Sequence, residues 1–399
     1  MRILALTNLY PNPVQPHRAS FNRHQFRLLS ERHALQVIAP TLWVDEWQQG
    51  KRSGVRIPAP RRVVNEGIVV DHPRYWYTPK LLRGLYGRFF MASVRKTFDR
   101  AVEEFGPDLV FSPWAYPDGW AAVRLAHRHG LPAVIQVHGS DVRQLDQFGA
   151  REGGTREAIV QADGVVAVSS ELAQRVVALG AAQDKVRVII DGVDKQVFRP
   201  GPKEDARRRL GLDPRRRHLL FIGNLLDVKG VDILLHACRV LKGQRGDWQL
   251  HLVGDGKRRG ALARLAESLD IHEQVVFHGS LPHHTLPTWL QAADLFVLPS
   301  RSEGIPNVLL EASACGTPYV ASAVGGIPEI AALGASRLVP PEQPAMLAEA
   351  IAAMLSAPPA TPATGPRDRE QAVEALSSFL DETLQRHRAA GSVSHHRAA

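Results

Sequence analysis

Short apolar runs alternate with amphipathic helical patterns along most of this 399-residue chain. Runs of this length suit strands buried on both faces of a parallel sheet, with the intervening helices covering those faces. We therefore predict an α/β fold with doubly wound sheets. Strands are predicted at 3–6, 37–39, 109–111, 133–137, 165–168, 186–190, 219–222, 250–253, 275–277, 295–298 and 319–321, and helices near 20–32, 79–105, 118–129 and 170–180.

The chain is longer than one hydrophobic core usually accommodates, so two domains are expected. The alternation stops at residues 198–217, which are rich in Pro, Gly and Arg, and then restarts. We predict an N-terminal domain over 1–200 and a C-terminal domain over 201–357. A flexible connector and a C-terminal helix are predicted over 358–387, followed by a disordered tail over 388–399.

The charge balance favours anionic partners, because 49 Lys and Arg residues against 40 Asp and Glu residues give a net charge of +9. Phosphates, acidic lipid surfaces and nucleic acid all meet this condition. Cys238 and Cys315 each lie in an apolar helical pattern, so we expect buried thiols rather than a disulfide or a zinc site. No apolar stretch approaches the length of a membrane span, and residues 1–8 turn polar too early for a signal sequence, so we expect a cytoplasmic protein.

Residues 294–329 carry the most informative functional pattern. The apolar strand near their start ends at Pro299, and a polar loop with Glu303 leads to a helix predicted to begin at Pro306 and to contain Glu311. Two carboxylates therefore flank a helix N-terminus, whose free N–H groups and partial positive charge favour a phosphate. The acids can hold hydroxyl groups of the molecule that carries the phosphate. The plain alternative is that both are ordinary charges at a helix edge.

The two acids are separated by seven residues and followed by Ala-Cys-Gly-Thr-Pro and Gly-Gly-Ile-Pro-Glu. This pattern resembles the donor-site motif of retaining glycosyltransferases of family 4. The resemblance implies a GT-B fold, in which two Rossmann-like doubly wound domains face a central cleft. It also implies a nucleotide-diphosphate sugar as donor, UDP- or GDP-linked, with no further cofactor. In enzymes of this arrangement the C-terminal helix often returns to the first domain.

The resemblance assigns donor-binding roles in the second domain. Glu311 is expected to bind the ribose hydroxyls, Glu303 to be the catalytic contact to the donor sugar, and Lys229 to bind the diphosphate. Asn224 stands where many family members have an arginine, so the diphosphate charge is met less fully here or is met by another arginine. Further donor contacts are expected from the loop and helix start at Gly304, Ile305, Pro306, Asn307 and Val308.

The reaction implied by the resemblance retains the anomeric configuration. In the favoured route the acceptor hydroxyl attacks from the leaving-group face and its proton passes to the departing phosphate, so no protein nucleophile is needed. Glu303 as a nucleophile is the alternative route. No Asp-x-Asp sequence occurs in the chain. We therefore expect no metal site and a metal-independent enzyme, in which Lys229 and the helix N-terminus stabilise the leaving group.

The first domain is expected to bind the acceptor. A predicted strand ends in Val-His-Gly-Ser-Asp, and the resemblance places His138 of this segment beside the reacting sugar as a catalytic residue. Asp141 is either an acceptor ligand or a helix cap. Arg18 and Arg23 follow the first strand and are candidates for an acceptor phosphate, or else belong to a basic solvated turn. Family members commonly carry a glycine near Ala19, so a backbone contact there is in doubt.

Residues 79–100 mix apolar side chains with Lys and Arg at helical spacing. A basic amphipathic helix of this kind can rest on an anionic bilayer. The alternative is a core helix whose arginines face water. On the first interpretation, Arg83, Arg88 and Arg95 would help to dock a peripheral enzyme on the inner face of a membrane that presents a lipid-linked acceptor.

The function expected from these features is sugar transfer to a saccharide or lipid-linked acceptor, in the synthesis of a cell-surface polysaccharide or glycolipid. A nucleotide-sugar epimerase of similar architecture is the alternative. A dinucleotide-dependent oxidoreductase is disfavoured, because the loop after the first strand lacks Gly-x-Gly-x-x-Gly. Nucleic acid is not an expected partner, since the Arg-rich stretch 207–217 lacks interleaved aromatic residues.

Overall fold

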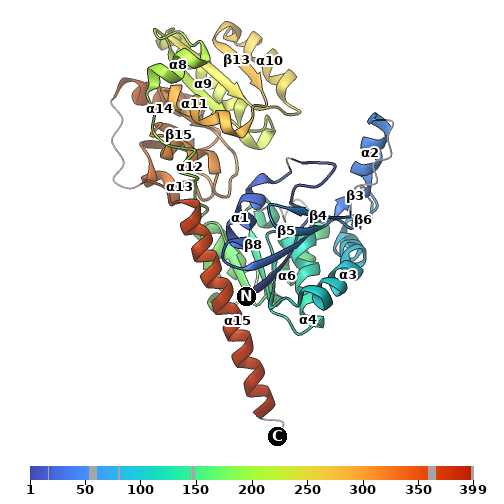
Figure 1. Ribbon diagram of the computed structural model, residues 1–399. Helices are drawn as coiled ribbons and strands as arrows, with labels where there is room; N and C mark the ends of the chain where they lie inside the picture. The colour runs from blue at the N-terminus through green and yellow to red at the C-terminus, as the bar shows by residue number, and fades with distance from the viewer. Residues whose placement is uncertain are drawn as a thin grey trace. The chain divides into compact units, whose positions relative to one another are not determined.

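The computed structural model describes residues 1–16, 18–53, 61–79, 81–143, 145, 149–357 and 365–396. The chain divides into two compact units (Figure 1). Unit 1 contains Met1–Ile190 and Glu370–Ala399, and unit 2 contains Asp191–Arg369. The first division therefore lies before the boundary predicted near residue 200. Most of the predicted connector lies outside the described residues.

Unit 1 is built on an eight-stranded sheet in the order β10-β9-β8-β7-β1-β2-β5-β4. Neighbouring strands are parallel except β4 and β5, which form an antiparallel hairpin at one edge. The strand order reverses between β1 and β7, which is the switch point of a doubly wound sheet. The strands are β1 (Arg2–Leu6), β2 (Ala34–Ile38), β4 (Arg62–Asn65), β5 (Ile68–Asp71), β7 (Leu109–Ser112), β8 (Ala133–Val137), β9 (Gly164–Ala167) and β10 (Val186–Val188), with β3 (Thr41–Leu42) and β6 (Arg74–Tyr75) forming a separate pair.

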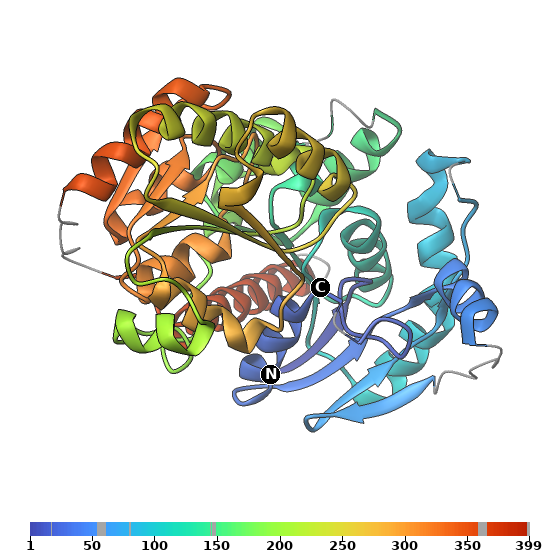
Figure 2. The same ribbon diagram turned by 90° about the horizontal axis from the view of Figure 1, so that it is seen from above.

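Most helices of unit 1 cover its sheet on both faces, whereas α2 lies away from the sheet beside β3 (Figures 1 and 2). They are α1 (Ser20–Ser30), α2 (Trp43–Ser53), α3 (Tyr86–Phe105), α4 (Trp120–Arg128), α5 (Ser140–Arg143), α6 (Gly149–Gln161) and α7 (Ser170–Ala178), with short turns η1 (Arg83–Leu85), η2 (Ala115–Gly119) and η4 (Gln183–Lys185). The predicted helix over 79–105 thus begins with a separate turn. No helix is predicted over α6, because its glycines give no apolar period. One of them, Gly154, lies so near the Tyr116 ring that an added Cβ would be 2.4 Å from it.

The C-terminal helix α15 (Arg369–His396) packs on the sheet of unit 1 (Figure 1). Its apolar face shares a buried cluster with β1, β2 and α1, to which it contributes Val373, Leu376, Phe379, Leu380 and Leu384. The prediction of a disordered tail is wrong for residues 388–396, which continue this helix. The apolar spacing ends after Leu384, but an existing helix extends at little cost through residues such as Ala389 and Ala390.

Unit 2 is built on a six-stranded parallel sheet in the order β13-β12-β11-β14-β15-β16. Counted along the chain this order is 3-2-1-4-5-6, that of a dinucleotide-binding fold, with its switch point between β11 and β14. The strands are β11 (Arg217–Ile222), β12 (Trp248–Val253), β13 (Val275–Gly279), β14 (Leu295–Leu298), β15 (Tyr319–Ser322) and β16 (Ser336–Val339).

The first and last helices of unit 2 precede and follow its strands in the chain, and the others connect successive strands as crossovers. The helices are α8 (Lys203–Leu210), α9 (Val231–Gln244), α10 (Arg259–Ser268), α11 (Leu286–Ala292), α12 (Asn307–Ala314), α13 (Ile327–Ile330) and α14 (Pro344–Ser356), with short turns η5 (Asp227–Lys229), η6 (His272–Gln274), η7 (His283–Thr285) and η8 (Ala331–Leu333). The α/β, doubly wound fold predicted from the sequence is confirmed. Both cysteines are buried free thiols, as predicted.

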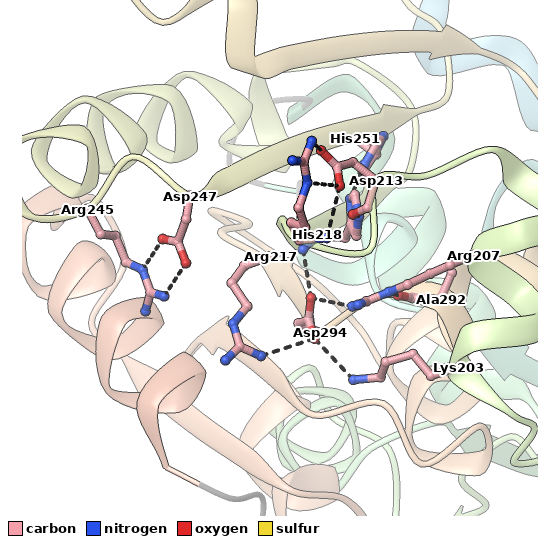
Figure 3. Close-up of polar contacts among 11 residues, drawn as sticks. Lys203, Arg207, Asp213, Arg217, His218, Arg245, Asp247, His251, Ala292 and Asp294 are labelled. Atoms are coloured by element: carbon pink, nitrogen blue, oxygen red, sulfur yellow. Dashed lines mark hydrogen bonds and ion pairs between the residues drawn. The ribbon is translucent and has the colours of Figure 1, made fainter.

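Asp294 organises the amino-terminal edge of the unit 2 sheet (Figure 3). One carboxylate oxygen accepts from Lys203 at 3.2 Å, and the other accepts from the His218 amide at 2.8 Å and from Arg207 at 2.5 Å. Burial opposes ionisation of Asp294, but the His218 amide and the two cations hold its pKa below its usual value. These contacts fasten α8 to the sheet, which is why part of the Pro-, Gly- and Arg-rich stretch at the predicted domain boundary forms a packed helix.

Candidate active site

The carboxyl-terminal edge of the unit 2 sheet brings together the loops after β11 and β14. These loops meet at the switch point, where open α/β sheets bind ligands. Gly230, with φ +63°, lies where an added Cβ would be 2.0 Å from the Pro299 carbonyl oxygen. Arg301 fixes the second loop to the first, since its amide donates to the Val228 carbonyl at 2.8 Å and its guanidinium pairs with Asp232 at 2.7 Å. The two loops therefore form one tightly packed edge.

Glu303 and Lys229, predicted separately for the donor sugar and the diphosphate, form an ion pair across these loops. The Lys229 ammonium lies 2.7 Å from Glu303 Oε1. The same oxygen accepts from the Ser300 hydroxyl at 2.6 Å, a contact that the sequence pattern did not predict. The side chains are 24% and 9% exposed. The carboxylate is thus held in place while Lys229 keeps further N–H groups for a ligand.

Helix α12 begins directly after the Glu303 loop. Pro306 is its N-cap, so the helix begins at Asn307, one residue later than predicted, and the N-cap side chain makes no capping hydrogen bond. The amides of Asn307 and Val308 are in the positions that have no acceptor within a helix. Gly304 and Ile305 form the approach to this end, and the Gly304 carbonyl accepts from the Gly326 amide at 2.9 Å. The helix thus presents an uncapped N-terminus of the kind that binds anions.

Glu311 lies in the second turn of α12 and is buried, with 7% of the residue exposed. Its Oε1 is 2.9 Å from Nε2 of His283, a residue of the η7 turn. His283 was not predicted as a site residue, because a histidine in a loop after the third strand carries no pattern that links it to Glu311. The two predicted carboxylates are therefore both present at this edge, each with a partner of its own.

Two further residues bear on the missing arginine of the predicted diphosphate clamp. Asn224 is exposed on the loop after β11. Arg258, at the start of α10, lies beside the same loop, with its amide donating to the Leu225 carbonyl at 3.1 Å and its Nε 3.0 Å from an Asp227 carboxylate oxygen. Arg258 was not predicted as a site residue. Its contacts place it beside the loop that carries Asn224.

His138 follows β8 in unit 1, at the carboxyl-terminal edge of that sheet. Its ring contacts two aromatic side chains: it is stacked with Trp114, with centroids 6.4 Å apart, and edge-on to Phe21 at 5.3 Å. Its Nε2 is buried and has no hydrogen-bond partner among the described residues. The arrangement offers one free polar atom within an aromatic setting.

Asp141 points into unit 1. Its Oδ1 accepts from the amides of His138 at 3.2 Å and Gly139 at 2.9 Å, and Oδ2 lies 3.4 Å from the Ala115 amide. Burial raises its pKa above the usual value, although these hydrogen bonds and the nearby His138 oppose that shift. The predicted roles were acceptor ligand and helix cap, and the contacts observed are of another kind, since the carboxylate accepts from amides of the segment before α5 and so holds the His138 loop.

Arg18 and Arg23 both have protein partners. Arg18 donates to the Asn8 carbonyl at 2.8 Å, to Asn8 Oδ1 at 2.9 Å and to Gln15 Oε1 at 2.7 Å. Arg23 pairs with Glu66. Ala19, between the two arginines, has a φ of +45°. Glycine, which family members commonly carry near this position, adopts this left-handed conformation more readily than alanine. The loop thus keeps the backbone shape that the missing glycine would favour.

Asp118, which the sequence analysis did not identify, joins the two loops at the switch point of unit 1. It is fully buried and accepts from the Thr7 hydroxyl at 2.9 Å, the Asn8 amide at 2.7 Å and the Asn8 side chain at 2.6 Å. Burial raises the pKa of Asp118 to about 6, against the lowering effect of these hydrogen bonds. Asp118 and Arg18 therefore hold Asn8 from two sides.

The residues that the structure describes contain neither a metal-binding group of side chains nor a helix that could cross a membrane. No group of three His, Cys, Asp or Glu side chains in that part of the chain is arranged to hold a metal ion. Likewise, no helix in it has both the length and the apolar character needed to cross a membrane.

Comparisons with known proteins agree across both units. Residues 202–374 match the model described as glycosyl transferases group 1, and residues 21–197 match that of glycosyltransferase family 4. D-inositol 3-phosphate glycosyltransferase 1 of Catenulispora acidiphila is 33% identical over 75% of this chain and 80% of its own length. A Bacillus subtilis protein described as the putative teichuronic acid biosynthesis glycosyltransferase TuaC is 30% identical over 88% of each chain.

Solved structures show the same fold over nearly the whole chain. Sucrose-phosphate synthase from Thermosynechococcus elongatus has a TM-score of 0.76 with 21% identity, covering 98% of this chain and 99% of its own. Anabaena HepE in complex with UDP-glucose has a TM-score of 0.66 with 19% identity, covering 98% and 100%. At these identities the likeness is one of fold.

Proposed function

The chain belongs to the glycosyltransferases of the group 1 and family 4 type, and on that premise we propose that it transfers a sugar from a nucleotide-diphosphate sugar to a hydroxyl of a saccharide or lipid-linked acceptor, with retention of configuration. The observation that carries this proposal is the grouping at one edge of unit 2. There Lys229, Glu303 and Glu311 surround the uncapped N-terminus of α12. An epimerase has no support from either family model.

The donor is proposed to bind on unit 2. Its diphosphate would accept hydrogen bonds from the α12 amides at Asn307 and Val308, where the helix dipole favours negative charge. Lys229 would supply a cation and Glu311 would accept from the ribose hydroxyls. UDP-glucose in the HepE structure shows that a protein of this fold binds such a donor. The base and the sugar used by this chain are open to direct test.

The proposed chemical step needs no protein nucleophile. The acceptor oxygen bonds to the anomeric carbon as the bond from that carbon to the phosphate oxygen breaks, and the acceptor proton passes to the departing phosphate. Glu303 suits a role in holding the sugar hydroxyls, because two donors already occupy its Oε1 and lower its power to attack carbon. The free Nε2 of His138 is proposed to contact a hydroxyl or the reacting centre.

Charge on the leaving diphosphate is proposed to be met without a metal ion. Lys229 and the α12 amides provide one part of this stabilisation. Arg258 provides another, since it lies beside the loop that carries Asn224. Transfer that continues at an unchanged rate in EDTA is the expected result, and loss of turnover that Mg²⁺ or Mn²⁺ restores would reject metal independence.

The acceptor is proposed to be a sugar of a growing cell-surface polysaccharide or glycolipid. The name of the TuaC relative points to teichuronic acid biosynthesis, and the other relative acts on an inositol phosphate by its name. In unit 1, Arg18 and Arg23 are engaged with their own chain, whereas Trp114, Phe21 and His138 form an aromatic setting with a free polar atom. These features favour a sugar ring over a phosphate as the group recognised.

A peripheral contact with the inner face of a membrane is also proposed, in a form that differs from the sequence hypothesis. Helix α3 buries its apolar side, including Phe90 and Phe98, and so is a core helix. The exposed apolar residues precede it: Leu81 is 68% exposed and Leu82 59%. They lie beside the exposed Arg83 in the sequence, which gives a small apolar and basic surface suited to an anionic bilayer.

Replacement of Leu81 and Leu82 by Ser and of Arg83 by Glu should abolish sedimentation with anionic vesicles. Unchanged sedimentation of that triple variant would reject the proposed membrane contact.

A thermal-shift panel of nucleoside diphosphates and their sugars tests the donor proposal. A ligand that binds only the folded protein raises the free energy of unfolding by RT ln(1 + [L]/Kd). The nucleotide sugar that gives the largest increase in melting temperature therefore identifies both the base and the sugar. The same donor is then offered with and without saccharide acceptors. Acceptor-dependent release of nucleoside diphosphate supports glycosyl transfer, while conversion of the donor sugar without acceptor would favour the epimerase.

A further inference from the structure

His283 makes a direct contact with the carboxylate assigned to ribose. Its Nε2 is 2.9 Å from Glu311 Oε1. An ionised carboxylate accepts hydrogen bonds and cannot donate them. In this contact Nε2 therefore carries the hydrogen and donates it to Glu311. The two residues belong to different segments of unit 2, the η7 turn after β13 and helix α12 after β14. Folding of the unit brings them together.

The His283 ring is also held from a second side. It lies edge-on to Phe198, with ring centroids 5.1 Å apart and an interplanar angle of 61°. Phe198 is 1% exposed, so it is a rigid neighbour. The turn itself is closed by Thr285, whose amide and hydroxyl donate to the Pro282 carbonyl at 2.9 Å and 2.8 Å. The direction of the imidazole is therefore set by its surroundings as well as by Glu311.

Glu311 has one oxygen committed and one available. Its side chain is 9% exposed, and no described residue donates a hydrogen bond to its Oε2. A buried carboxylate that rotates freely would lose rotamer entropy on binding a ligand, whereas one already fixed by a donor does not. The contact with His283 thus prepares Oε2, and the remaining lone pair of Oε1, for two further donors.

We propose that His283 is a positioning residue that orients Glu311 toward the 2′ and 3′ hydroxyls of the donor ribose. The inference rests on the proposed function, in which Glu311 binds ribose. It assigns a role to the loop after β13, which the sequence motif does not include. His283 contributes to nucleotide affinity through Glu311 and only when the ligand carries those hydroxyls.

The adjacent His284 provides a matched control. It belongs to the same η7 turn and is exposed. Its side chain makes no hydrogen bond, ion pair or ring contact with any described residue. His284→Ala therefore changes the same turn by the same number of atoms without touching Glu311. Any effect of the turn's sequence alone should appear equally in both alanine variants.

The test compares ribonucleotides with ligands that lack the hydroxyls. Calorimetric titration of the full chain with UDP and GDP, and with their 2′,3′-dideoxy forms, gives a ribose increment for each protein variant. We expect His283→Ala to weaken binding of the preferred ribonucleotide about threefold to tenfold, the range of one hydrogen bond to a charged group that is partly exposed. Binding of the dideoxy form should change by less than twofold, so the increment shrinks.

Two further variants separate positioning from general damage. His283→Gln places an amide N–H near the position of Nε2 and should restore most of the increment. His284→Ala should keep the wild-type increment, and the melting temperatures of all variants show whether unit 2 is still folded. A positioning role predicts that the effect is on nucleotide affinity and KM for the donor, with kcat changed little.

The outcomes distinguish the inference from the proposed function. If Glu311→Ala loses the ribose increment while His283→Ala keeps it, the positioning role is rejected and the proposed function stands. Tighter ribonucleotide binding by His283→Ala would also reject it, because His283 would then compete with ribose. If neither UDP nor GDP binds, or if Glu311→Ala keeps the full increment, the assignment of Glu311 to ribose fails and the inference fails with it.

Discussion

The two switch points of this chain share a topology but use their acids differently. In unit 1, Asp118 is fully buried, and its hydrogen bonds go to Thr7 and Asn8 of the facing loop. In unit 2, Glu303 and Glu311 lie on the loop and helix after β14, each with one oxygen given a protein partner and the α12 N-terminus uncapped between them. One acid serves the fold, and the other two remain able to bind a ligand.

This difference shows that a doubly wound sheet provides the place for a ligand but not the chemistry. The loops meet at the carboxyl-terminal edge in both units because of strand order. In unit 1 the buried Asp118 accepts its hydrogen bonds from its own chain. The free polar group near that edge is the His138 ring, which lies among aromatic side chains. In unit 2 the acids and Lys229 keep unused hydrogen-bonding capacity. A donor with phosphate and hydroxyl groups suits the second edge.

The largest effect is expected from removing the unit 2 acids. Glu303→Ala should lower kcat by about 10² to 10³, or ~2.7–4 kcal/mol, the range for loss of one group that acts at the reacting centre. Glu311→Ala should instead weaken donor binding and raise KM. Steady-state kinetics with saturating acceptor measure both, and the exposed Glu273→Ala serves as control. Wild-type kcat in Glu303→Ala together with wild-type KM in Glu311→Ala would remove the basis of the proposed site.

The next effect is expected from the unit 1 acid, and it should be on stability. Asp118→Ala leaves the Thr7 hydroxyl and two Asn8 donors without their acceptor, and each buried unsatisfied group costs ~1–3 kcal/mol. We expect a loss of about 3 kcal/mol in the stability of unit 1. Hydrogen exchange of β1 and β7 measures it, with the exposed Glu103→Ala as control. UDP or GDP binding to unit 2 should not change, and a parallel loss of affinity would contradict the division of roles.

Mild acid should affect the two units in opposite directions. The pKa of Asp118 is raised from 3.8 to about 6, so its contribution to stability is present below pH ~4 and is lost as the pH rises through about 6. Burial, with the neighbouring His218 and His278, lowers the pKa of His251 in unit 2 from 6.5 to about 3. Its contribution is therefore present above pH ~6.5 and is lost as the pH falls.

Between pH 6 and pH 4, unit 1 should gain stability from Asp118 while unit 2 loses stability from His251. Hydrogen exchange, corrected for the intrinsic pH dependence of amide exchange, resolves the units by comparing β1 and β7 with β11 and β12. Asp118→Asn should remove the first trend and His251→Gln the second. The same slope in both units would show that other groups dominate the pH response.

The sequence predicted what depends on local patterns. The strand at 133–137 and the strand at 295–298 were predicted with the bounds that the structure has, and a helix was correctly predicted to start between Glu303 and Glu311. Partners distant in sequence were not predictable. Asp118 bonds residues 110 and 111 positions away, and His283 is 28 positions from Glu311. No periodicity records such pairs, because folding alone brings them together.

The smallest effect concerns the weakened phosphate clamp of unit 2. Arg258→Ala should weaken nucleoside diphosphate binding about threefold, a small loss because the guanidinium is 41% exposed and already paired with Asp227. Asn224→Arg adds a cation to the exposed loop where many family members have one and should tighten binding by a similar factor. In Asn224→Arg the Arg258→Ala change should then have less effect, since the two cations serve one diphosphate.

Calorimetry with UDP and GDP against the corresponding nucleosides isolates this phosphate contribution. Strict additivity of the two changes would mean that Arg258 acts elsewhere, and the α12 N-terminus with Lys229 would then carry the diphosphate without it.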